Sequence, residues 1–147
     1  MTQDDTKLAQ QIGPGCVLRI RGDVFDVDDL LSRVTFRACH ISRKGKPRFG
    51  PTSKIANATW FNVVVSESGL DNLQEQINDA EIFMNAHSGN LQYSRSYAGV
   101  TGAELDFSVR RRDVVVQNEY LPASLIRLAG KYGLAINISQ YPNGSDI

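Results

Sequence analysis

Residues 60–84 read WFNVVVSESGLDNLQEQINDAEIFM, and this stretch predicts a strand followed closely by a helix. Between Trp60 and Val65, alternate side chains belong to two different faces, which is the period of a half-buried strand. Ser68 and Asp71 then form a Ser-x-x-Asp pattern, which predicts a capped helix start at Ser68. The helix has one apolar side, formed by Leu73, Ile77, Ala80 and Met84. A strand and an amphipathic helix in succession predict an α+β fold.

The same two periods recur on both sides of this unit. Further strands are predicted over 16–21, 35–43, 103–109, 114–116 and 134–141, and further helices over 26–34 and 122–132. Asp26 is the expected N-cap of the first helix, and Pro122 and Gly133 suit the two ends of the last. Residues 85–102 are polar and glycine-rich, and we expect a loop there.

The predicted order is β-α-β-β-α-β followed by β-α-β, and its first six elements have the ferredoxin-like order. We therefore expect an α+β two-layer sandwich with a ferredoxin-like core extended by β-α-β. Its sheet would be mostly antiparallel, with helices on one face. The other face would be partly solvated, with these candidates on it: Arg19, Arg21, Trp60, Asn62, Asn137, Ser139 and Tyr141.

The composition is that of a globular protein. The chain has 147 residues, of which 41% are hydrophobic and 22% charged, and its formal net charge is zero. We expect a polar leader over 1–15, a single domain over 16–142 and a tail over 143–147. Neither a membrane span nor a signal peptide is apparent, which predicts a cytoplasmic location. Cys16 and Cys39 are then expected to be reduced, buried thiols.

Charge is segregated along the chain. Residues 30–66 hold seven basic residues and no acid, whereas residues 67–106 hold seven acids and one base. One interpretation is that the two blocks face each other and neutralise. The other is that the basic block attracts an acidic partner.

No pattern of catalytic, cofactor-binding or metal-binding residues is recognisable. The two histidines, His40 and His87, have no nucleophile at a supporting spacing, and no zinc or dinucleotide motif occurs. Glu104 and Asp106 share one strand face, either as a paired-carboxylate site or as an ordinary exposed surface. We therefore expect a protein that is not an enzyme and that needs no cofactor.

Several segments resemble, in their order along residues 17–142, the bacterial domain-of-unknown-function 4279 family. They are Leu18-Arg19-Ile20-Arg21-Gly22, Phe25 to Leu31, Arg43-Lys44-Gly45, Ala58 to Val63, Leu121 to Ala129 and Leu134 to Tyr141. The resemblance implies a small bacterial α+β domain and brings no catalytic residues with it. It also suggests a role beside secreted toxins, as a neighbour or an antidote.

The leading functional hypothesis is a non-enzymatic, cytoplasmic binding protein whose partner is another protein, with toxin immunity as one form of this role. Two surfaces are candidates, the acidic helix face (Asp71, Glu75, Asp79 and Glu81) and the basic loop (Arg43, Lys44, Lys46 and Arg48). A homodimer that covers a sheet edge is a further expectation.

Two alternatives remain open. One is nucleic-acid binding through the basic loop 43–54 and Trp60. The other is a small-ligand site or enzyme that uses residues 43–59 as a lid over Arg21, Trp60 and Tyr141.

Overall fold

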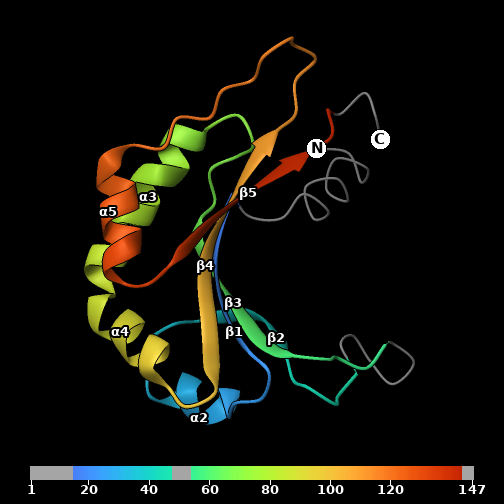
Figure 1. Ribbon diagram of the computed structural model, residues 1–147, viewed down its shortest axis with the longest axis vertical. Helices are drawn as coiled ribbons and strands as arrows, with labels where there is room; N and C mark the ends of the chain where they lie inside the picture. The colour runs from blue at the N-terminus through green and yellow to red at the C-terminus, as the bar shows by residue number, and fades with distance from the viewer. Residues whose placement is uncertain (1–14, 48–53, 144–147) are drawn as a thin grey trace.

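The computed structural model describes residues 15–47 and 54–143 and has an α+β architecture (Figure 1). Its elements are β1 (Cys16–Gly22), α2 (Val27–Ser32), β2 (Ala38–Ser42), β3 (Thr59–Ser66), α3 (Leu73–Ala86), α4 (Ser88–Ser96), β4 (Val100–Arg110), α5 (Ala123–Lys131) and β5 (Ala135–Tyr141). Apart from Gly15 and Asn143, the expected leader and tail lie outside the described residues.

The strands form one open sheet in the order β2-β3-β1-β4-β5. All neighbouring pairs are antiparallel except β4 and β5, which are parallel. Strand β1 therefore lies between β3 and β4, and Leu18 is paired with Val63 on one side and with Leu105 on the other. The sheet is mostly antiparallel, as predicted.

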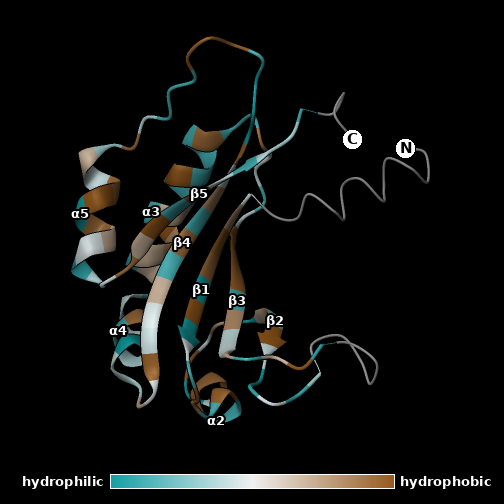
Figure 2. Cartoon of the chain, turned by 45° about the vertical axis from the view of Figure 1, so that its right-hand side comes forward, coloured by the Kyte–Doolittle hydropathy of each residue, from teal (hydrophilic) through white to brown (hydrophobic). Residues whose placement is uncertain are grey.

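One face of the sheet is covered by α3, α4 and α5, and α2 lies at one end of the sheet (Figure 1). Apolar side chains from the strands and from α2, α3, α4 and α5 meet in one buried cluster. Figure 2 shows the corresponding apolar stretches along β1 and β3. The largest of these fully buried side chains are Phe61, Phe107, Leu18, Ile20, Leu30, Ile77, Met84, Leu91, Leu105 and Leu125.

Local signals position α2 and α5 as predicted. The carboxylate of Asp26 accepts a hydrogen bond of 3.0 Å from the backbone N–H of Asp29 and so caps α2. Helix α5 begins directly after Pro122 and ends before Gly133, whose φ of +67° is a left-handed conformation that glycine adopts without strain.

The predicted start of α3 at Ser68 is wrong. The helix begins at Leu73, after an N-cap residue, Asn72, whose side chain makes no capping bond. The backbone N–H of Asn72 donates to the carbonyl of Gly69, so that a turn occupies the expected first helical residues. Asp71 consequently precedes the helix.

The expected loop over 85–102 is also wrong, because most of it forms α4 and the start of β4. Its glycine, serine and asparagine residues have low helix propensity. Burial overrides that propensity, since the apolar side chain of Leu91 is fully buried in the core. The end of α4 is fastened to α2 by the hydroxyl of Tyr97, which donates to the carboxylate of Asp29 at 2.6 Å.

The β-α-β extension is wrong in its first strand. Residues 114–116 form no strand, and among the described residues the sheet has five strands where six were expected. Strand β4 continues to Arg110, and α5 connects it to the parallel strand β5. Cys39 also departs from expectation, because it is exposed, whereas Cys16 is buried and both thiols are free.

Candidate functional site

The face of the sheet opposite α3, α4 and α5 carries a polar network centred on Arg19. The Nε of Arg19 donates to Oδ1 of Asn62 at 3.0 Å, and its Nη1 donates to Oε1 of Glu104 at 3.1 Å. The guanidinium also lies 5.9 Å from the ring centroid of Trp60, within the range of a cation–π contact. Arg19 thereby connects β3 to β4 across β1.

Asp106 extends this network to β5. Its carboxylate accepts hydrogen bonds from Ser139 Oγ at 2.7 Å and from Asn137 Nδ2 at 3.1 Å, and lies 3.7 Å from the guanidinium of Arg19. Glu104 and Asp106 therefore act as acceptors for a neighbouring arginine and neighbouring polar groups. Among the predicted exposed-face residues, Arg19, Asn62, Asn137 and Ser139 are joined in this way.

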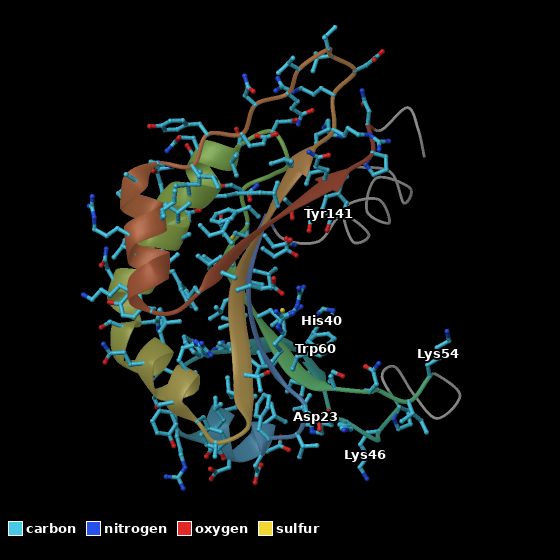
Figure 3. All side chains as sticks on the ribbon, in the orientation of Figure 1. Asp23, His40, Lys46, Lys54, Trp60 and Tyr141 are labelled. Atoms are coloured by element: carbon cyan, nitrogen blue, oxygen red, sulfur yellow. The ribbon has the colours of Figure 1, made fainter. Side chains whose placement is uncertain are left out.

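A hollow of about 420 Å³ lies at one end of this face. It is lined by Arg19, Arg21, Gly22, Asp23, Ala58, Trp60, Thr101 and Glu104. Ala58 belongs to the loop between β2 and β3, so the root of the predicted lid borders the hollow. Arg21 and Trp60 both line the hollow, but Tyr141 lies toward the other end of the sheet (Figure 3). The expected grouping of Arg21, Trp60 and Tyr141 is therefore correct for two of its three residues.

The basic loop is partly neutralised by acids close to it. Arg43 contacts the carboxylate of Asp28 through two hydrogen bonds of 2.7 and 3.2 Å, and Lys44 contacts that of Asp23 at 2.7 and 2.8 Å. The bond from Arg43 lowers the pKa of Asp28. Asp23 and Asp28 belong to residues 1–29. One interpretation expected residues 67–106 to neutralise the basic block, but at Arg43 and Lys44 the neutralising acids come from the start of the chain instead.

The described arms of the loop, residues 43–47 and 54–58, extend away from the sheet (Figure 3). Backbone hydrogen bonds from Gly45 to Ala56 and from Ala56 to Lys46 join its two arms into a short hairpin extension. Lys46 and Lys54 point outward from these arms (Figure 3). Arg48, the remaining residue of the predicted basic surface, lies outside the described residues.

The predicted acidic helix face is divided among different contacts. Asp71 pairs with Arg110 at 3.1 Å, Asp79 accepts from Ser66 Oγ at 2.6 Å, and Glu81 accepts from Ser124 Oγ at 2.6 Å. Glu75 is exposed on α3. Asp79 and Glu81 therefore connect α3 to β3 and α5, and Asp71 connects the turn before α3 to β4.

The segment 111–122 was not predicted as a binding surface. It projects beyond the sheet between β4 and α5 (Figure 1). At its tip, Val114, Val115 and Val116 are 52%, 103% and 68% exposed. The only hint in the sequence was that three apolar residues between charged and amide neighbours are few for a strand.

Gln117 closes the base of the first part of this segment, residues 111–117, which we call the valine loop. Its Oε1 accepts from the backbone N–H of Arg112 at 2.8 Å, and its Nε2 donates to the carbonyl of Arg110 at 2.9 Å. The same Nε2 donates to Glu119 at 2.7 Å. The side chain of Gln117 thus holds the loop in a defined shape with its valines outward.

Within residues 15–47 and 54–143, no group of three or more His, Cys, Asp and Glu side chains is placed to hold a metal ion. No helix of this same part of the chain is long and apolar enough to cross a membrane. Comparisons with protein-family models, with curated proteins and with solved structures find no match to this chain.

Proposed function

We propose that the protein is a non-enzymatic binding protein that inserts its valine loop into an apolar pocket of a protein partner. The observation that carries this proposal is the exposure of Val114, Val115 and Val116 at the tip of a loop braced by Gln117. A preorganised apolar tip loses little conformational freedom on binding, and buried apolar anchors dominate the energy of many interfaces.

The charges beside the tip indicate the chemistry of the partner. Arg111 and Arg112 precede the valines and are both exposed. Asp113 follows them and is exposed as well, so a complementary pocket would be apolar inside and carry charged groups of both signs on its rim.

A protein fits this tip better than a lipid bilayer does. The three valine side chains together have fewer carbons than one myristoyl chain, which by itself binds membranes only marginally. Asp113 and Glu119 also lie in or beside the loop and offset the charges of Arg111 and Arg112, so the segment has no excess positive charge to attract an anionic membrane surface.

The toxin-antidote role is the specific form of this function that we carry forward, with the cytoplasm as its location. A loop that fills a partner's pocket blocks access to that pocket, which is what an inhibitor of an enzyme toxin needs. Nucleic acid is less well supported as the partner, because Arg43 and Lys44 of the basic loop are already paired with carboxylates.

The test is affinity capture from an extract of the source cells at low and at moderate salt, with three forms of the protein. These are the wild type, Val115→Asp, and the control Ile126→Asp, which replaces an exposed apolar residue on α5. We expect a stoichiometric partner with the wild type and with Ile126→Asp, and its loss with Val115→Asp.

Two results would contradict the proposal. Retention of the same partner by Val115→Asp would show that the valine loop is not the anchor. Binding of the wild type to phosphatidylserine vesicles, or to nucleic acid that salt releases, would assign the protein to a different class.

We also propose that the sheet is a variant of the ferredoxin-like core. The proposal is supported by the antiparallel order β2-β3-β1-β4 and by the helical segments after β1 and β3. In this description, α5 and β5 are an addition at the edge of β4.

A further inference from the structure

We propose that the hollow beside Trp60 binds an organic carboxylate, with Arg21 holding the carboxylate and Trp60 contacting the apolar body of the ligand. The site lies on the sheet face and does not involve the valine loop, so it is independent of the function proposed above.

The pairing of charges in the hollow leaves Arg21 available. Four charged residues line the hollow, namely Arg19, Arg21, Asp23 and Glu104. Glu104 accepts a hydrogen bond from Arg19, and Asp23 accepts two from Lys44. Among the described residues, the one ionic contact of Arg21 is with Oε1 of Glu104 at 3.9 Å, beyond hydrogen-bond distance.

Arg21 is also accessible and well placed for a ligand. Its side chain is 57% exposed, and it lies across from Gly102 on β4. A Cβ atom at position 102 would be 3.0 Å from the Nε of Arg21. Glycine therefore lets the arginine side chain lie close to β4, where its planar guanidinium borders the hollow.

The surroundings favour a carboxylate. A guanidinium presents paired N–H donors that match the two oxygens of a carboxylate. Phosphate would match the same donors, but Asp23 and Glu104 in the wall repel a doubly charged anion more strongly than a singly charged one. The hollow, at about 420 Å³, is within the range of small-ligand sites.

The apolar side of the ligand has a matching wall. Trp60 and Ala58 line the hollow together with Thr101. We therefore expect a carboxylate attached to a small apolar or aromatic body, rather than a small ion such as formate, to bind best.

Trp60 supplies the measurement, because it is the only tryptophan in the chain and lines the hollow. The wild-type protein is titrated with benzoate, with its uncharged analogue benzamide and with inorganic phosphate while tryptophan fluorescence is recorded. We expect a saturable change with benzoate, and neither benzamide nor phosphate should match it. A capped glutamate, N-acetylglutamate amide, is a further arm that distinguishes an acidic protein side chain from a free aromatic acid as the source of the carboxylate.

Arg21→Gln should weaken benzoate binding by about tenfold or more, because it removes a charge-assisted contact. Arg127→Gln on α5 is the matched control and should bind benzoate like the wild type. Gly102→Ala, which displaces Arg21 without removing its charge, should weaken binding by less than Arg21→Gln. Urea unfolding of each variant establishes that it is folded.

Three results with the carboxylate ligands and benzamide would overturn the carboxylate site. They are the absence of a saturable change with benzoate and with the capped glutamate, an equal response to benzamide, and an undiminished affinity in Arg21→Gln. Tighter binding of phosphate than of benzoate would also overturn it, since the hollow would then be a general oxyanion site. The Val115→Asp variant should bind benzoate normally, so failure here is separable from failure of the valine loop.

Discussion

Gln76 provides a sharp test of how α3 is held on the sheet. It is fully buried, and its Nε2 donates to the carbonyls of Gly69 at 2.9 Å and of Ser108 at 2.8 Å. Its Oε1 accepts from the backbone N–H of Ser108 at 3.2 Å. Gln76→Met keeps the length of the side chain and removes all three hydrogen bonds.

The expected loss of stability follows from what remains after the substitution. The N–H of Ser108 also donates to the carbonyl of Gly15 at 2.8 Å, so the loss of its second acceptor costs little. The two bonds that Gln76 donates contribute about 1 kcal/mol each, and we therefore expect a loss of about 2 kcal/mol in the free energy of unfolding. For a chain of this size that corresponds to a decrease in Tm of roughly 4–8 °C.

The assay is equilibrium unfolding in urea, followed by the fluorescence of Trp60. Gln74→Met is the matched control, because Gln74 is exposed on the same helix and its amide donates to Asn78 at 3.3 Å. This control should stay within about 0.5 kcal/mol of the wild type. If Gln76→Met proved as stable as Gln74→Met, the attribution of stability to the buried amide would be refuted.

Three further predictions concern other parts of the structure. The bond from Tyr97 to Asp29 raises the pKa of Tyr97 to about 12 and lowers the pKa of Asp29. Its stabilisation should therefore be lost as the pH falls below the ordinary aspartate value of 3.8 and as it rises from 10 through about 12. In a Tm-versus-pH series, Tyr97→Phe should differ from the wild type most between these limits, and a constant difference would contradict the assignment. Ellman's reagent should modify Cys39 in the native protein and Cys16 only in urea, because Cys16 is buried and burial raises the pKa of its thiol. If both thiols of the native protein reacted rapidly with the reagent, the buried position of Cys16 would be contradicted. Val115→Asp should change the free energy of unfolding by no more than about 0.5 kcal/mol, because Val115 is fully exposed, and a larger loss in urea unfolding would show that the tip packs on the fold.

Strands β1, β3 and β4 were predictable because each keeps a period of two over most of its length. The caps of α2 and α5 were predictable because Asp26 and Pro122 act on their own neighbours along the chain. Helix α4 was not predictable, since its residues favour a loop and tertiary contacts, such as the burial of Leu91 in the core, favour the helix.

The candidate sites divide in the same way. Alternation along the strands identified Arg21 and Trp60 as residues of the exposed face, and the structure places both at the hollow. A run of three valines also suggested a strand at Val114–Val116, but a strand needs a neighbour to accept its hydrogen bonds. The chain turns away from the sheet after Arg110, and those valines are left in an exposed loop.

The sequence by itself determined the α+β class, the faces of the central strands and the ends of two helices, because these depend on residues that are near one another along the chain. Only the tertiary structure decided which charges are compensated. Arg43 pairs with Asp28 and Lys44 with Asp23, whereas the one ionic contact of Arg21 within the described part of the chain is the 3.9 Å approach to Glu104. Such pairs join residues far apart along the chain, and a local sequence period cannot predict which distant charged residues the fold brings into contact.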